Sequence, residues 1–198
     1  EYYGSLDAPS NPQNSQRFFP YPNQYKQQDI TIEFTYEKKL IDQLDKLLWK
    51  AITKDKWEIV VKFTWRYNQR AHELCSEIGK ALKLLHVNKE VVDGFYMVVM
   101  DYVKAKPLYN CSSSLSYDEC KTVFEDIEEA ISKLHKKNIV FADLSGEEGI
   151  ECYPSFMNHE YINWPPGAEN RKKLSREHDT HWLKLLKSKY LANSVDLE

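Results

Sequence analysis

One lysine lies within an apolar stretch that is typical of a buried strand. Lys62 follows Val60 and Val61 and precedes Phe63, and a helix is expected to begin after Asn68. An ammonium group held on a strand in this way can neutralise the phosphates of a nucleotide. The other interpretation is a lysine on an edge strand that reaches solvent, and the lysine alone favours that interpretation.

Two further motifs follow Lys62 in the chain. Residues 97–100 (Met-Val-Val-Met) form an apolar strand that continues into residues 101–103, and taken alone this is an ordinary core strand. Leu134 and His135 lie near the end of a long helix predicted at residues 116–137. The segment that follows it, residues 139–144, contains Asp143. The order of lysine strand, helix, apolar strand, long helix and aspartate loop resembles the protein-kinase-like superfamily over residues 47–190.

The resemblance implies a role for each of these residues. Lys62 would contact the phosphates of ATP, while Met100 and the backbone groups of Asp101 and Val103 would hold the adenine edge. Asp143 would be the base that orients the acceptor hydroxyl. The implied cofactors are ATP and Mg²⁺.

The carboxylate that should pair with Lys62 is less clear. The superfamily places it on the inward face of the helix, where this sequence has Ala71. Glu73 and Glu77 lie off that face and are the remaining candidates, of which Glu73 is preferred.

Several strings are more specific, and they resemble a group of fungal kinase-like proteins related to aminoglycoside phosphotransferases and RIO kinases. Some members of that group are fused to Crinkler-type secreted effectors. The strings are Lys62-Phe63-Thr64 with Tyr67 and Ala71-His72, then Tyr153-Pro154, Asn158, residues 162–167 and Glu177-His178-Asp179.

The sequence also departs from the superfamily. No glycine occurs between Gly4 and Gly79, so the glycine-rich phosphate loop is absent or replaced. Phe141 and Ala142 stand where the superfamily has His and Arg or Gly. Leu144 runs directly into Ser145, where about two dozen residues with an Asn and a D-F-D or D-F-G segment are expected to hold Mg²⁺.

Two explanations of that gap stay open: the segment exists but is missing from this sequence, or it has been lost. The metal ligands are therefore unknown. Glu147, Glu148 and Glu151 could imitate metal ligands, although a solvated acidic turn is the favoured interpretation.

Three functional classes remain. The first is transfer of phosphate from ATP to a hydroxyl acceptor, with protein Ser or Thr among the candidates. The alternative is a catalytically impaired, pseudokinase-like module that binds an unknown protein partner, and a secreted effector domain is a third class. His178, Asp179 and His181 could also ligate a metal, but a helix cap or an ion pair is favoured.

Hydrophobic periodicity predicts the elements. Strands are expected at residues 30–34, 47–52, 57–63, 82–87, 95–100 and 139–141, and helices at 68–79, 116–137 and 175–190. Residues 38–48 have leucines at helical or mixed spacing. Asn68 and Ser116 are the expected N-caps.

The predicted fold is α+β, an abbreviated two-lobed kinase-like domain. Residues 1–29 form an extended or partly disordered arm whose aromatic residues could dock on a partner or mediate a homodimer. Residues 30–103 form a small antiparallel sheet lobe with one helix, residues 104–194 form a helical lobe, and residues 195–198 resemble a cloning remnant.

Composition narrows the functional classes. The 198 residues carry a net charge of −3, so nucleic acid is a disfavoured partner. No apolar run reaches the roughly 20 residues that span a bilayer, which argues against a membrane protein. Four widely spaced cysteines favour a reducing compartment, and hence a cytoplasmic or nuclear location unless the chain is a secreted effector.

Overall fold

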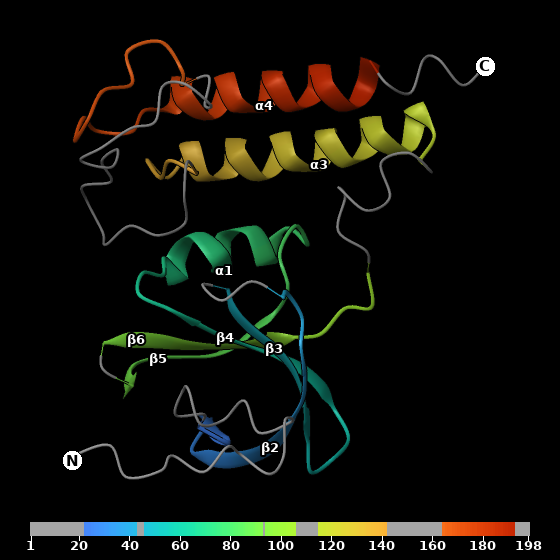
Figure 1. The fold of residues 1–198 in the computed structure, drawn as a ribbon, viewed down its shortest axis with the longest axis vertical. Helices are drawn as coiled ribbons and strands as arrows, with labels where there is room; N and C mark the ends of the chain where they lie inside the picture. The colour runs from blue at the N-terminus through green and yellow to red at the C-terminus, as the bar shows by residue number, and fades with distance from the viewer. Residues whose placement is uncertain (1–21, 43–45, 93, 106–114, 142–163, 193–198) are drawn as a thin grey trace, which may run out of the picture.

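The structure is a computed structural model that describes residues 22–42, 46–92, 94–105, 115–141 and 164–192, with the backbone alone at 90–92. Its layers are an antiparallel sheet, helix α1 over one face of it, and the paired helices α3 and α4 beyond α1 (Figure 1). The elements are β1 (Gln24–Gln27), β2 (Ile30–Lys39), β3 (Leu47–Thr53), β4 (Glu58–Thr64), α1 (Gln69–Glu77), β5 (Leu84–Val92), β6 (Phe95–Asp101), α3 (Tyr117–His135) and α4 (Arg176–Ala192). The mixed α/β character expected from the sequence is confirmed.

The sheet of the described residues has the strand order β1-β2-β3-β4-β6-β5, with antiparallel neighbours throughout. The strands expected at residues 47–52 and 57–63 are β3 and β4, which pair as a hairpin with Leu47 opposite Phe63 and Ile52 opposite Glu58. The sheet also curls, because Tyr25 on β1 stacks near His86 on β5 with ring centroids 5.8 Å apart. Strands at the two ends of the strand order therefore meet.

The two faces of the sheet bury different clusters. Alternation along β4 sends Ile59, Val61 and Phe63 to one face and Val60 and Lys62 to the other. The first face holds the larger aromatic core, which contains Tyr25, Phe34, Trp49, Ala51, Ile59, Val61, Phe63, Met97 and Val99. The second face, which we call the helix face, packs Val60, Val98 and Met100 against side chains that flank α1, namely Tyr67 and Leu82.

Helix α1 begins where the sequence predicts. The side chain of Asn68 accepts a hydrogen bond from the backbone N–H of Ala71 at 2.9 Å, which satisfies one of the free N–H groups of the first turn. The helix ends before Gly79, which adopts a φ of 71° that suits glycine. Its buried side chains pack on α3, where Ala71, Leu74 and Cys75 meet Ala130 and Leu134.

Helix α3 has the capping box that Ser116 predicts. Glu119 N–H donates to the Ser116 hydroxyl at 3.2 Å, and Ser116 N–H donates to the Glu119 carboxylate at 2.8 Å. Phe124 and Ile131 on α3 then pack against Leu183 on α4. This pairing forms the helical layer.

Three local predictions are corrected. Residues 24–27 of the predicted arm form β1, because Tyr25 is buried against the sheet and β2 supplies the hydrogen-bonding partner. Residues 38–48 are not helical where they are described: they contain the end of β2 and the start of β3. Residues 139–141 are not a strand, because the Ile139 and Phe141 N–H groups bond to Leu134 C=O and to the Asp179 side chain.

Some expectations fall outside the described part of the chain. Residues 1–21 of the arm, and with them the homodimer contact, stay a prediction, as does the remnant at 195–198. Within the described residues, no helix combines the length and apolar character needed to cross a membrane.

Candidate functional site

Lys62 lies at the centre of the sheet, on the helix face. On β4 it stands between Leu48 of β3 and Val98 of β6, and two residues earlier Val60 stands opposite Met100. Lys62 is half-buried, and Met100 is buried. The structure therefore brings Lys62 and Met100 to one apolar surface that faces the helices.

The segment that follows β6 leaves the backbone N–H of Val103 free. Asp101 N–H donates to Lys83 C=O at 3.0 Å, and Tyr102 N–H donates to Glu58 C=O at 3.3 Å. Val103 C=O accepts from Ala105 N–H at 2.9 Å, whereas Val103 N–H has no partner among the described residues. Val103 is 57% exposed, so its N–H can receive a ligand.

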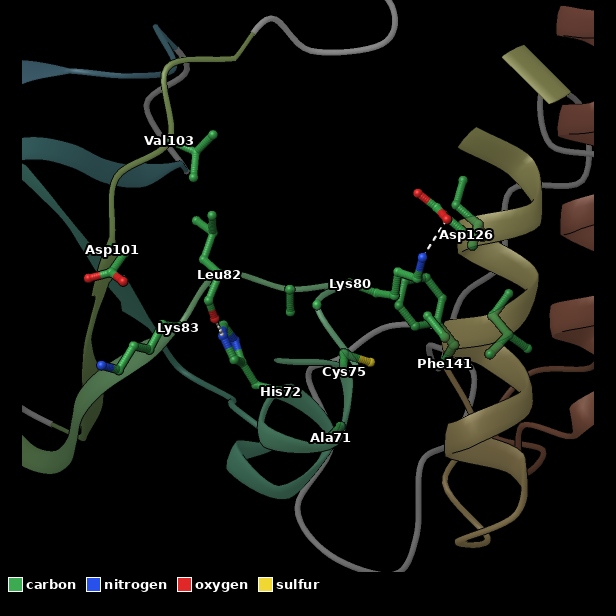
Figure 2. Close-up of a pocket in the computed structure, with 15 residues that line it drawn as sticks. Ala71, His72, Cys75, Lys80, Leu82, Lys83, Asp101, Val103, Asp126 and Phe141 are labelled. Carbon is green, nitrogen blue, oxygen red and sulfur yellow. Dashed lines mark hydrogen bonds and ion pairs between the residues drawn. The ribbon is translucent and has the colours of Figure 1, made fainter. Parts of the chain in front are cut away.

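A pocket of about 700 Å³ opens between the sheet, α1 and α3 (Figure 2). The predicted residues Asp101 and Val103 line it, but Lys62, Met100 and Glu73 do not. Its apolar wall comes from both helices and from the segment between α1 and β5, and consists of Ala71, Cys75, Ala81, Leu82, Ile127, Ala130, Ile131 and Phe141. At its edge, Lys80 forms an ion pair with Asp126.

Hydrogen bonds through one histidine fix α1 against the sheet. His72 Nε2 lies 2.6 Å from Leu82 C=O, and its Nδ1 lies 2.7 Å from the Tyr67 hydroxyl. A carbonyl can only accept, so Nε2 carries the proton and Nδ1 accepts from Tyr67 in the neutral ring. Burial, aided by the Glu73 carboxylate, raises the pKa of Tyr67 and keeps its hydroxyl protonated. The sequence marked Tyr67 and His72 only as part of a motif.

The Glu73 carboxylate bonds to Gln69 of its own helix and not to Lys62. Glu73 is exposed on α1, and its carboxylate accepts a hydrogen bond from the Gln69 side chain at 2.8 Å. Glu77 forms an ion pair with Lys133 of α3, with 3.5 Å between Nζ and Oε2. The pairing of Lys62 with Glu73 therefore stays a prediction.

The turn between β2 and β3 occupies the place expected for a phosphate loop. Leu40 N–H donates to Leu48 C=O at 2.9 Å, which closes the hairpin on residues 41–46. The sequence has no glycine there. Residues 43–45 lie outside the described residues, so the loss or replacement of a glycine-rich loop stays a prediction.

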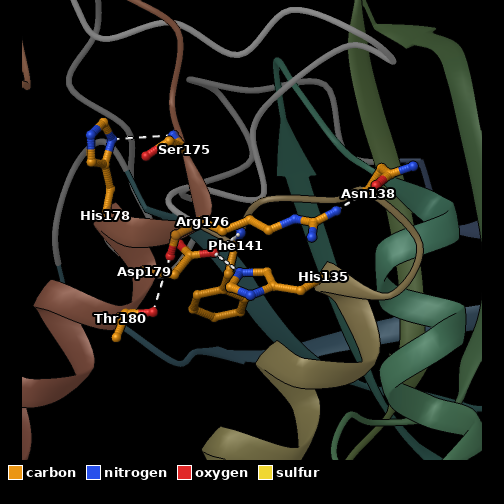
Figure 3. Close-up of polar contacts among 8 residues, drawn as sticks. All are labelled: His135, Asn138, Phe141, Ser175, Arg176, His178, Asp179 and Thr180. Atoms are coloured by element: carbon orange, nitrogen blue, oxygen red, sulfur yellow. Dashed lines mark hydrogen bonds and ion pairs between the residues drawn. The ribbon is translucent and has the colours of Figure 1, made fainter.

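A buried carboxylate joins the end of α3 to α4 (Figure 3). One oxygen of Asp179 accepts hydrogen bonds from His135 Nε2 and from Phe141 N–H, both at 2.7 Å. The Asp179 side chain is 1% exposed, and its other oxygen has no hydrogen-bond partner among the described residues. This network fixes the backbone two residues before Asp143, which itself lies outside the described residues.

Two of the nearby histidines bond to other groups of the protein. His178 Nδ1 accepts a hydrogen bond from Ser175 N–H at 3.2 Å, and burial lowers the pKa of His178. His178 bonds at the start of α4 and Asp179 bonds to His135, while the preference for a cap or an ion pair over a metal role stays a prediction. Within the described residues no three His, Cys, Asp or Glu side chains gather as a metal site, and Glu147, Glu148 and Glu151 lie outside them.

Sequence comparisons place the chain in no family. No family model matches it, and no curated protein matches it. Solved structures do match. The chain is similar to the Cydia pomonella granulovirus kinase PK-1 with a TM-score of 0.63 and 18% identity, covering 80% of this chain and 68% of that one.

The fold is therefore protein-kinase-like. The match is to a kinase over most of this chain, which supports the kinase-like fold expected from the order of the motifs. The fungal, RIO and Crinkler associations are not supported by any of these matches.

Proposed function

We propose that the chain binds ATP between its sheet and its helical layer and transfers the terminal phosphoryl group to a hydroxyl of an acceptor, with protein Ser or Thr as the first candidates. In this proposal the two layers act as the two lobes of a kinase-like domain. The observation that carries the proposal is the shared placement of Lys62 and Met100 on the helix face, within a kinase-like fold.

The adenine ring would bind at the end of β6. The free N–H of Val103 can donate to a ring nitrogen, and the apolar side chains of Ala81 and Leu82, which line the same pocket, can contact the ring. Lys62, on the helix face of β4, would neutralise phosphate oxygens. These are properties that a nucleotide site needs.

The acceptor end would depend on Asp143 and on Asp179. Asp143 would accept the proton of the attacking hydroxyl, and Asp179 would hold the preceding backbone through Phe141 N–H. Mg²⁺, when bound, would neutralise charge on the phosphates. The described residues supply no metal ligands, so those stay unassigned.

One observation favours the pseudokinase-like alternative. Residues 40–46, between β2 and β3, contain no glycine, whereas a loop that cradles phosphates with its backbone N–H groups is rich in glycine. A domain of this fold without that cradle could still bind a nucleotide or a protein partner and transfer no phosphate.

Nucleotide binding is the experiment that separates these functions. Isothermal titration with Mg-ATP should give a Kd between about 1 μM and 1 mM. Lys62→Met should weaken binding at least about tenfold, since it removes a charge from the phosphates. The control is Lys54→Met, whose lysine lies at the exposed β3–β4 turn and pairs with Glu33.

The outcomes are distinct. No binding of Mg-ATP by the wild-type chain would refute the proposal. Binding without phosphate transfer to a Ser-containing protein mixture would support the pseudokinase-like alternative. Transfer that is lost in Asp143→Ala, with binding retained, would establish the proposed role of Asp143.

A further inference from the structure

Cationic side chains gather where α3 ends and α4 begins. All are exposed, and they are Lys136, Lys137, Arg171, Lys172, Lys173 and Arg176, which we call the basic surface. Residues 136–138 and 169–177 contain these six cations and two carboxylates, whereas the whole chain has a net charge of −3. The basic surface is thus a local reversal of the overall charge.

Contacts hold the parts of this surface together. The Arg176 guanidinium donates to the Asn138 side chain, which ties the first turn of α4 to the turn after α3 (Figure 3). Of the two carboxylates, Glu169 pairs with Lys172 at 3.1 Å. Glu177 accepts a hydrogen bond from the Ser175 side chain, which lowers its pKa. Positive charge therefore exceeds negative charge on this surface.

A groove of about 410 Å³ runs between α3 and α4 at this surface. Lys136 and Arg176 line it together with the hydroxyl-bearing residues Ser132 and Thr180. Its one acidic lining residue among those described, Glu128, forms an ion pair with Lys187. Guanidinium, ammonium and hydroxyl groups in one concavity are suited to carboxylates.

The groove adjoins the residues that fix the proposed catalytic loop. His135 lines it, and the same histidine donates to the Asp179 carboxylate that holds Phe141 N–H. Asp143 follows Phe141 by two residues in the sequence. A ligand in the groove would therefore lie beside the segment that carries the proposed base.

We propose that the basic surface binds an acidic peptide segment, with carboxylate side chains entering the groove between Lys136 and Arg176, and that this segment belongs to the phosphate acceptor. Its identity as acceptor rests on the proposed phosphotransfer, but peptide binding does not. A long polyanion such as nucleic acid fits less well, because the carboxylates of Glu128 and then Glu125 follow Ser132 along α3 away from Lys136.

Fluorescence anisotropy tests the binding directly. The probe is a labelled ten-residue peptide with one Ser among Asp and Glu residues, and its partner probe carries Asn and Gln in their place. The wild-type chain should bind the acidic peptide at least about tenfold more tightly than the neutral one, and binding should weaken between 50 and 300 mM NaCl as exposed charges are screened.

Matched charge reversals locate the surface. Lys136→Glu, Lys137→Glu and Lys173→Glu combined should weaken acidic peptide binding at least about tenfold. The control combines Lys26→Glu, Lys38→Glu and Lys121→Glu, which are exposed elsewhere and change the net charge equally. It should alter binding less than about threefold. Arg171 is left unchanged because its φ of 60° could make a substitution alter the backbone.

Each other result overturns the proposal. If the wild-type chain binds the neutral and the acidic peptide equally, the ligand is not acidic. If both triple variants weaken peptide binding equally, the basic surface is not the binding site. A twelve-nucleotide DNA strand that binds more tightly and displaces the peptide would assign the surface to nucleic acid. Titration with Mg-ATP in parallel tests the proposed nucleotide site separately. Peptide binding without ATP binding would refute the proposed phosphotransfer and leave the peptide site standing.

Discussion

Asp179 is a buried carboxylate that accepts two hydrogen bonds on one oxygen. Asp179→Ala would leave the His135 side chain and the Phe141 N–H without their acceptor. We expect it to lower the free energy of unfolding by about 3 kcal/mol, and Asp179→Asn, which keeps an acceptor, by about 1 kcal/mol. Urea unfolding followed by circular dichroism measures both, and equal stability of wild type and Asp179→Ala would show that the network contributes nothing.

The lowered pKa of His178 makes the free energy of unfolding depend on pH. Burial lowers its pKa below the ordinary value of 6.5, so below that pH the unfolded chain takes up a proton that the folded chain does not. Stability is therefore full above about pH 6.5 and is lost as pH falls. Protonation would also remove the Nδ1 lone pair that accepts the Ser175 N–H.

The variant His178→Asn keeps an acceptor but cannot titrate. Its free energy of unfolding should fall less than that of wild type between pH 7 and pH 5, measured by urea unfolding at each pH. Part of the fall should remain, because burial also lowers the pKa of His86. Identical slopes for wild type and variant would contradict the assignment to His178.

At the scale of elements, strong local signals predicted the structure well. Asn68 and Ser116 begin α1 and α3 as expected, because capping depends on a side chain and the three residues after it. Strand β1 was not predicted because its sequence is polar apart from Tyr25. It is a strand because it pairs with β2. Such pairing is a tertiary effect that local sequence does not carry.

The candidate site was predictable only in part. The register of β4 and β6 confirms that Lys62 and Met100 share a face, which strand alternation allows one to infer. The role of Asp179 could not be inferred, because its partners His135 and Phe141 lie about 40 residues away in sequence. The sequence signal was limited to its spacing, since Asp179 lies four residues before Leu183 and so on the same side of the helix.

The joint between α1 and α3 combines apolar packing with exposed ion pairs, and the packing should dominate. Leu134 is fully buried, so Leu134→Ala should lower the free energy of unfolding by about 3 kcal/mol. The neighbouring Lys133→Ala, which removes a partly exposed ion pair with Glu77, should cost less than about 1 kcal/mol. Urea unfolding compares the two, and a larger effect of Lys133→Ala would reverse this ranking.

For the whole molecule, the question is whether sheet and helical layer unfold together. The sheet has a large aromatic core of its own, whereas α3 and α4 share only a small one, built on Phe124, Ile131 and Leu183. Two helices with so little buried surface depend on tertiary packing for their stability. The helical layer should therefore remain folded only while α1 joins it to the sheet.

Two tryptophans report on the two layers. Trp49 is buried in the sheet core, and Trp182 lies on α4, where its ring meets that of Trp164 with centroids 6.1 Å apart. With 5-fluorotryptophan incorporated, their fluorine resonances should lose native intensity at the same urea concentration in wild type. In Leu74→Ala, which weakens the α1 side of the joint, the Trp182 midpoint should fall by about 1 M more than that of Trp49. Leu186→Ala on the exposed side of α4 should leave the two midpoints together. If the two midpoints already differ in wild type, the two layers unfold independently. If both midpoints shift together in Leu74→Ala, the helical layer does not unfold before the sheet even when the contact with α1 is weakened.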